Sequence, residues 1–446
     1  MANIKESISS EIGKIRVVDT HEHIMAESER NEYALDFSYL FALYNSSDLV
    51  SAGMPPGLME AARLPIHRFR VAWVQRMRFP RYYTPLPARE DMSLEERWQA
   101  IEPYWEAIRN TAYAKQTLIA AREIFGVEDL NRDTYVQLSQ AIADSRHPGW
   151  YRHVMKEKAG IDVSVVDINT TDVDRELFAP SVRLDPFIQA VSRVELRGLE
   201  EETNMAIHSL DDLVYAMHTT LKRYTDNGAV ALKSWLAYRR MLRYDKVTRH
   251  DAEVVFNQIA SHLGEGPSWA EAKPLQDYMM HQAIRAAIDA GLPIQIHTGI
   301  QEGNENIVTN SNPAHLINLF IEYREARFDL FHGGYPYVHE WATLAKNFAN
   351  VYPDLSWVHI ISPEIGRRLL HELIETVPGN KILAFGGDSI TVERAYGHCR
   401  MARDVVSRAL TEKVEDGYMT EDEAVALGRN MLRNNPSRLY RLSIND

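Results

Sequence analysis

The chain has 446 residues, a formal net charge of −13, 45% hydrophobic residues and 25% charged residues, which is the composition of an ordinary globular protein. The acidic balance argues against nucleic acid as the main partner, because phosphate binding needs clustered Lys and Arg. The single cysteine, Cys399, cannot form an intramolecular disulfide, and no apolar stretch reaches the ~20 residues that span a bilayer. With a polar N-terminus that does not resemble a signal peptide, we expect a cytoplasmic protein without membrane contact.

Short runs rich in β-branched residues, each ending in polar residues, recur along the chain and alternate with helical patterns. This alternation is typical of an α/β protein with a parallel sheet, and eight such runs predict a (β/α)₈ TIM barrel. The predicted strands are residues 15–19, 161–168, 187–194, 229–235, 293–298, 328–332, 355–361 and 382–385.

The predicted helices fill the gaps between strands, as βαβ units require. Three of them, residues 210–226, 275–290 and 365–377, end at glycine or proline signals. A large helical insertion, approximately residues 24–158, follows the first strand and includes one long helical stretch over 93–121.

The insertion accounts for much of the excess over the ~250 residues of a typical barrel. Because it follows a strand, it should lie at the catalytic face, as a lid or an oligomer contact within a single domain. A basic cluster within it is expected to be a solvated or inter-subunit face, or else an anion-attracting lid, and consists of Arg63, Arg68, Arg70, Arg76, Arg78 and Arg81.

The carboxyl ends of barrel strands meet at one mouth, so the residues at these ends are candidates for a common site. His21 and His23 lie two apart at the end of the first strand and therefore share a face. A lone histidine is more often structural than functional, but histidines at three separate strand ends with an aspartate at a fourth are hard to obtain by chance. Imidazole and carboxylate suit zinc, or else Mn²⁺ or Fe²⁺. The predicted ligands of one or two ions are His21, His23, Lys233, His297, His332 and Asp388.

The run Val17-Val18-Asp19-Thr20-His21-Glu22-His23 resembles the first-strand signature of the amidohydrolase superfamily, and His297, His332 and Asp388 follow in that family's order and spacing. The segment 434–440 is similar to the family's closing helix. Leu232-Lys233-Ser234 followed by Ala237-Tyr238-Arg239 resembles the amidohydrolase-2 branch.

This resemblance implies a metal-dependent hydrolase in which His21, His23 and Asp388 hold one metal. Asp388 would also take the proton from the attacking water and pass it to the leaving group. His297 and His332 would hold a second metal or, in one-metal relatives, polarise the substrate carbonyl. Lys233 would be carboxylated on its amine and bridge two metals; the alternative is an ammonium that binds a substrate carboxylate.

Four further residues have weaker signals. Asp19 shares the strand face of the histidines, and is either a partner that fixes an imidazole tautomer or a structural residue. Arg239 could bind a substrate carboxylate in a bidentate fashion, or form a surface ion pair. His359 and Tyr335 lie where they could touch the substrate.

The leading hypothesis is hydrolysis of an amide-type C–N bond in a small, carboxylate-bearing compound, by a chain that forms a homo-oligomer. The alternative within enzymes is non-hydrolytic chemistry at one metal, as in decarboxylases of aromatic acids or uronate isomerases. A metal-binding protein without catalysis is the third reading, and Asp388 argues against it, because a binding module needs no base beside its metal.

Overall fold

The computed structural model describes residues 4–62, 92–261 and 266–444. Seven strands form one sheet in sequential order with every neighbouring pair parallel, the arrangement expected of a TIM barrel. The strands are β1 (Val17–Glu22), β2 (Ile161–Val166), β3 (Phe178–Val182), β4 (Ala231–Ser234), β5 (Ile294–Ile296), β6 (Phe328–Leu330) and β7 (Val351–Pro353).

The segment 382–389 takes the place of an eighth strand and hydrogen-bonds to both edges of this sheet. On one side Leu383 donates its amide to Pro353 of β7 (2.9 Å). On the other side Thr20 of β1 donates to Phe385 (3.1 Å), and the amide of Asp388 donates to His21 (2.7 Å). The backbone that carries Asp388 is therefore tied directly to the strand that carries the histidine pair.

Two strand predictions are wrong. The third strand is β3, and the predicted run 187–194 instead covers the end of α10 (Asp185–Ile188) and the start of α11 (Arg193–Thr203). Ser192 caps α11 by accepting a hydrogen bond from the amide of Glu195 (3.3 Å). The true strand was masked by Pro180, which lacks the amide donor that a strand interior normally uses.

The seventh strand is β7, which ends before the predicted run 355–361 begins. Trp357 adopts a left-handed conformation (φ 70°), which breaks an extended chain, and α17 (Val358–Ile361) follows at once. The apolar run is buried as a predicted strand would be, but it is not a strand.

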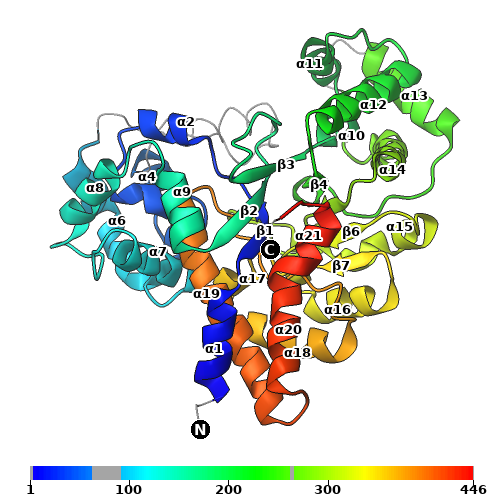
Figure 1. The fold of residues 1–446 in the computed structure, drawn as a ribbon. Coiled ribbons are helices and arrows are strands. Elements are labelled where there is room, and N and C mark those ends of the chain that lie inside the picture. Colours follow the sequence, from blue (N-terminus) through cyan, green and yellow to red (C-terminus); the bar gives the residue numbers. More distant parts are fainter. Residues whose placement is uncertain (1–3, 63–91, 262–265, 445–446) are drawn as a thin grey trace.

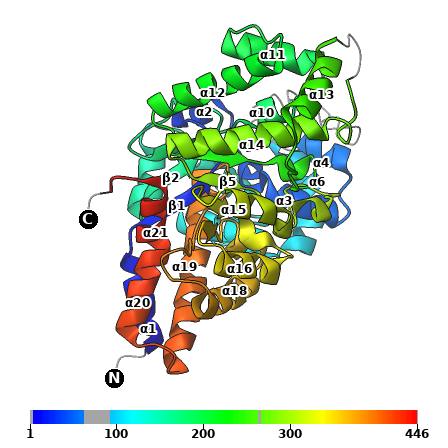
Figure 2. The same ribbon diagram turned by 90° about the vertical axis from the view of Figure 1, so that its right-hand side faces the viewer.

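Helices surround the sheet as βαβ units require, and most of their predicted bounds agree with the structure. Residues 210–226 form α12, and Ser209 caps this helix with a capping box. On the outside of the sheet lie α1 (Ile4–Lys14), α12 (Leu210–Asp226), α13 (Arg249–Ser261), α14 (Lys273–Ala290), α15 (Ile317–Glu322), α16 (Val338–Asn347), α18 (Pro363–Thr376), α19 (Val392–Glu415), α20 (Glu421–Arg429) and α21 (Asn435–Tyr440). Helices α1 and α20 pack along α19 (Figures 1 and 2).

The insertion forms a helical layer beside the sheet, drawn in blue and cyan in Figure 1. The predicted long helix 93–121 is two helices, because the first ends at Ile108 and Thr111 caps the start of the second. The described helices are α2 (Glu27–Glu32), α3 (Tyr44–Ser51), α4 (Pro56–Ala62), α6 (Leu94–Ile108), α7 (Ala112–Glu123), α8 (Tyr135–Asp144) and α9 (Trp150–Arg152). The predicted arginine cluster at 63–81 lies outside the described residues. Within the described ranges, no helix is long and apolar enough to cross a membrane.

A buried ion pair fastens the insertion to the barrel. Arg30 of α2 and Glu393 of α19 are both fully buried, and their charged groups lie 2.7 Å apart. The same carboxylate accepts from the indole of Trp150 (2.7 Å), while Arg30 also donates to Ser145 (2.7 Å). Removing one partner of such a pair leaves the other charge buried and uncompensated.

We therefore expect Arg30→Met to lower the free energy of unfolding by about 3–5 kcal/mol, measured by urea denaturation. The control is Arg132→Met, which breaks an exposed ion pair with Glu102 in the same insertion and should change stability little. Equal small losses in both variants would show that the buried pair does not hold the insertion in place.

Candidate metal centre

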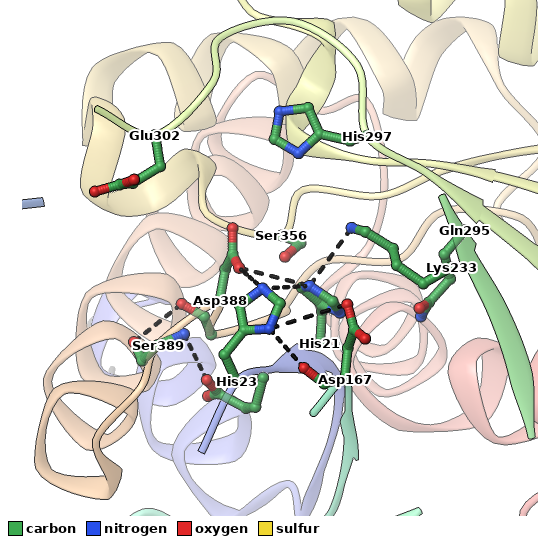
Figure 3. A network of polar contacts seen from close by, with 12 residues as sticks. His21, His23, Asp167, Lys233, Gln295, His297, Glu302, Ser356, Asp388 and Ser389 are labelled. Atoms are coloured by element: carbon green, nitrogen blue, oxygen red, sulfur yellow. Dashed lines mark hydrogen bonds and ion pairs between the residues drawn. The ribbon is translucent and has the colours of Figure 1, made fainter. Parts of the chain in front are cut away.

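The residues predicted as ligands converge at the carboxyl end of the sheet. His21 lies on β1 and Lys233 on β4, while His23, His297 and His332 follow β1, β5 and β6, and Asp388 lies in the segment that closes the sheet. Figure 3 shows His21, His23, Lys233 and Asp388 gathered together, with the ring of His297 above them, although they come from distant parts of the chain. The parallel topology brings these strand ends to one mouth.

His21, His23 and Asp388 form the tightest group. The Nε2 atoms of the two imidazoles lie 3.2 Å apart, and Oδ1 of Asp388 lies 3.2 Å from that of His23 and 3.5 Å from that of His21. Among the His, Cys, Asp and Glu side chains of the described residues, these three form a group whose ligand atoms all lie within 4.8 Å of one another.

The tautomer of His23 follows from its outer hydrogen bond. Its Nδ1 lies 2.8 Å from the carbonyl oxygen of Asp167, and a carbonyl can only accept, so Nδ1 carries the proton. In the neutral ring, Nε2 then has a free lone pair directed at His21 and the carboxylate of Asp388. A converging set of lone pairs and a negative charge fits a cation.

A second pair of imidazoles shows the same pattern. Nδ1 of His332 donates to the carbonyl of Ser356 (3.0 Å), and Nε2 of His297 donates to the carbonyl of Ile300 (2.8 Å). Their other nitrogens, His332 Nε2 and His297 Nδ1, face each other at 3.0 Å with no proton between them in the neutral rings. Two unprotonated nitrogens that face each other repel, and a cation bound between them would turn this repulsion into attraction.

Burial keeps these groups in the protonation states that metal ligands need. It lowers the pKa of His332 to about 3 and, together with the charge of Lys233, lowers the pKa of His21 well below its usual value. Burial alone would raise the pKa of Asp388, but the close approach of His23 (Nε2–Oδ1 3.2 Å) and of the other imidazoles holds it well below the usual range. His21 and His332 are therefore neutral imidazoles that lie beside a carboxylate.

Lys233 is buried within the same cluster. Its Nζ lies 3.5 Å from Nε2 of His21 and 3.8 Å from the ring centroid of Phe331. Burial lowers the pKa of this amine to about 8. Lys233 is therefore held against the metal-ligand candidates, as its position on β4 predicts.

The other candidates are distributed differently. Asp19 accepts from the backbone amides of His21 (3.1 Å) and Gly387 (3.0 Å) and from Ser164 (2.8 Å), so it joins β1 to the closing segment and does not set an imidazole tautomer. The guanidinium of Arg239 lies near the rings of Trp235 and Trp269, 5.6 and 5.7 Å from their centroids.

The sequence places His359 at the end of the seventh strand, and this is wrong. His359 lies in α17, is fully buried, and donates from Nε2 to the carbonyl of Ala384 (2.8 Å). It supports the closing segment and has no surface open to a substrate. Tyr335 is half-buried and lies three residues after His332, and its role as a substrate contact stays a prediction.

Sequence reasoning missed several residues of the mouth. Asp167 and Arg183 form a buried pair with Nε–Oδ2 at 2.8 Å, and they follow β2 and β3 directly. Their positions at strand ends could have marked both as residues of the mouth. Arg183 was overlooked because the third strand was predicted in the wrong place. The hydroxyl of Tyr44 donates to the carbonyl of Asp388. Tyr44 lies in the insertion, so the pattern of strand ends could not identify it.

Comparisons with known proteins agree with this geometry. A family model described as amidohydrolase matches residues 219–442. Protein fluG of Emericella nidulans is 30% identical over 227 residues, which cover 49% of this chain and about a quarter (26%) of fluG.

Among solved structures, two isomerases resemble this chain over nearly its whole length. A uronate isomerase from Thermotoga maritima has a TM-score of 0.76 at 15% identity (98% of this chain, 97% of that one). A glucuronate isomerase from Caulobacter crescentus has a TM-score of 0.77 at 16% identity (99% and 95%). A protein from Lactobacillus casei assigned as a metal-dependent hydrolase has a TM-score of 0.64 at 18% identity (98% and 99%). These likenesses show the fold.

Replacing His21 and His23 together with Ala removes two of the three converging ligand atoms. We expect the purified double variant to lose its tighter divalent metal, measured by elemental analysis, and to lose activity. The control is His281→Ala, which removes a buried histidine of α14 that bonds Tyr323 away from the mouth, and it should keep its metal. Full occupancy in the double variant would contradict the assignment.

Proposed function

Because this chain belongs to the amidohydrolase family, we propose that it is a metal-dependent hydrolase that cleaves an amide-type C–N bond in a small, carboxylate-bearing compound. One observation carries the proposal. Four imidazoles, a carboxylate and a buried lysine meet at the mouth of the barrel, and three of the imidazoles have their outer N–H bound to a backbone carbonyl.

The donor set fits one or two divalent ions, with zinc the best match to imidazole and carboxylate. His21, His23 and Asp388 would hold one ion, and His297 and His332 a second. A divalent cation bound there supplies a Lewis acid that acidifies water and polarises a carbonyl oxygen.

Asp388 is suited to move the proton. Its carboxylate is nearly buried, with Oδ1 beside His23 (3.2 Å) and Oδ2 3.9 Å from Nε2 of His332. It takes a proton from the attacking water at a carboxylate oxygen and delivers it to the leaving nitrogen, as a positioned acid–base group does. His332 cannot be the proton donor at Nε2 in its neutral form, because its one N–H is bound to Ser356. This favours a ligand role for His332.

We propose that Lys233 is carboxylated. Its neutral amine attacks dissolved CO₂, the new N–C bond forms as the amine loses a proton to solvent, and the product is an anionic carbamate. An ammonium beside bound cations would be strongly disfavoured, whereas a carbamate would offer two anionic oxygens as ligands. The support is its position, with Nζ 3.5 Å from His21.

Arg239 is our candidate for the substrate carboxylate. Its guanidinium lies near the rings of Trp235, directly after β4, and Trp269, just before α14. Burial lowers the pKa of Arg239 only to about 10, so it is charged at neutral pH. A guanidinium presents paired donors that match a carboxylate.

The second candidate function is non-hydrolytic chemistry at one metal, as in a decarboxylase or an isomerase of the uronate type. The observation in its favour is that, within the described residues, three candidate ligand atoms come together only at His21, His23 and Asp388, whereas His297 and His332 are a pair. The isomerase-like structures support it through their fold alone. The number of metals and the state of Lys233 decide between the two.

Asp388→Asn retains the shape of the side chain but removes the proton acceptor. We expect kcat to fall by about 10²–10⁴-fold, the usual contribution of a positioned acid–base group. Metal content must be measured alongside, because Asp388 is also a proposed ligand. Asp404→Asn, on the exposed face of α19, is the control. A near-normal rate with normal metal content would refute the role.

The state of Lys233 is measured by metal analysis and by NMR after equilibration with isotopically labelled bicarbonate. We expect the wild-type protein to contain two metals per chain and to show a carbamate signal. Lys233→Ala should lose this signal, one of the two metals and the activity. Short carboxylic acids should partly restore the activity of the variant. Lys381→Met is the control, because burial also lowers the pKa of Lys381 to about 8, but this amine donates to two backbone carbonyls away from the mouth. One metal and an unmodified Lys233 would favour the isomerase or decarboxylase class.

A further inference from the structure

Tyr44 is the first residue of α3 in the insertion and reaches across to the barrel mouth. It is 2% exposed, and its ring stacks with Tyr113 of α7 (4.9 Å, 18°) and with Trp357 after β7 (4.7 Å, 22°). The ring is therefore packed against one residue of the insertion and one of the barrel.

The hydroxyl of Tyr44 donates to the backbone carbonyl of Asp388. Asp388 has a φ of 49°, in the left-handed region that residues other than glycine rarely adopt. Such a conformation persists only when the surroundings hold it. The amide of Asp388 donates to His21 (2.7 Å), so the two hydrogen bonds hold both peptide groups of this residue.

We propose that Tyr44 is a positioning residue that fixes the backbone of Asp388, and with it the direction in which the carboxylate points. The insertion is then a structural part of the metal centre rather than a separate lid. This inference rests on the proposed function in one respect, namely that Asp388 is a metal ligand.

The attachment of the insertion supports this role. Arg394, which follows Asp388 closely in the chain, donates to the carbonyl of Ala42, just before α3. It also donates to the side chain of Gln116 on α7 (2.8 Å), and Gln116 donates back to the carbonyl of Arg394 (2.7 Å). Hydrogen bonds thus join the start of α19, which follows the segment that carries Asp388, to α7 and to the residues just before α3.

Tyr44 acts through Asp388 and not on the substrate. Its side chain is buried against two rings, and its hydroxyl is committed to a backbone carbonyl. Trp357, on the other side of the stack, lies edge-on to His332 with ring centroids 5.2 Å apart. The same aromatic stack therefore touches residues from both proposed ligand groups.

The test is Tyr44→Phe in the full chain, which keeps the stacked ring and removes the hydroxyl. Loss of a partner that orients a ligand typically weakens metal binding by 10–100-fold, and we expect about tenfold weaker zinc binding in competition with a chelator. The cobalt(II) form should show an altered absorption spectrum. The matched control is Tyr151→Phe, which removes another buried hydroxyl of the insertion, one without a hydrogen-bond partner among the described residues.

A second readout does not depend on metal. In the metal-free protein, hydrogen exchange of the Asp388 amide should become about tenfold faster in Tyr44→Phe and stay unchanged in Tyr151→Phe, because the local structure opens more readily. Unchanged exchange and affinity in Tyr44→Phe, or equal changes in both variants, would overturn the inference. If exchange changes as expected but the wild type binds no divalent metal, the positioning role stands and the proposed metal chemistry fails.

Discussion

The centre depends on one constraint, which is that the outer N–H of three mouth histidines is bound to a backbone carbonyl. His23, His297 and His332 each donate outward, so each turns an unprotonated nitrogen toward the middle of the mouth. Carbonyls that are fixed by the barrel backbone leave little freedom for an imidazole to flip. The direction of the lone pairs is thus set by the fold before any ion binds, and this preorganisation distinguishes a metal centre from a chance gathering of histidines.

The same mouth concentrates backbone strain. His332, Trp357 and Asp388 follow three successive strand positions, and all three have positive φ values, at 67°, 70° and 49°. Each turn costs energy for a residue with a side chain, but it directs the chain sharply away from the strand at the end where the side chains must meet. The cost is offset by packing, since Trp357 stacks on Tyr44 and the backbone of Asp388 is bonded on both sides. The insertion, which packs over these turns, therefore helps to stabilise the strained backbone at the mouth.

The sequence alone predicts the barrel and brings the six ligand candidates to one mouth, because strand periodicity and strand-end position are local signals. It fails where tertiary context decides. Pro180 makes β3 hard to recognise from the sequence, and Arg183 at its end was therefore overlooked. The left-handed conformation of Trp357 ends the extended chain, so the apolar run after it forms a helix instead of the predicted strand. The contact between Tyr44 and Asp388 joins residues 344 positions apart and leaves no trace in either local pattern. Local rules thus locate the ligands, while the groups that hold the ligands emerge only from the folded chain.

The floor of the barrel extends this argument from the mouth to the end of the chain. Tyr440 of α21 donates to Asp329 of β6, and its hydroxyl accepts from Gln295 of β5 (2.9 Å). Burial raises the pKa of Asp354 to about 7 and that of its neighbour Asp329 well above its usual value, because two charges side by side in the interior are disfavoured. Asp354 in turn accepts from the amide of Ser356 (2.6 Å), whose carbonyl orients His332. A series of polar side chains and backbone groups therefore connects α21 to His332, a proposed ligand.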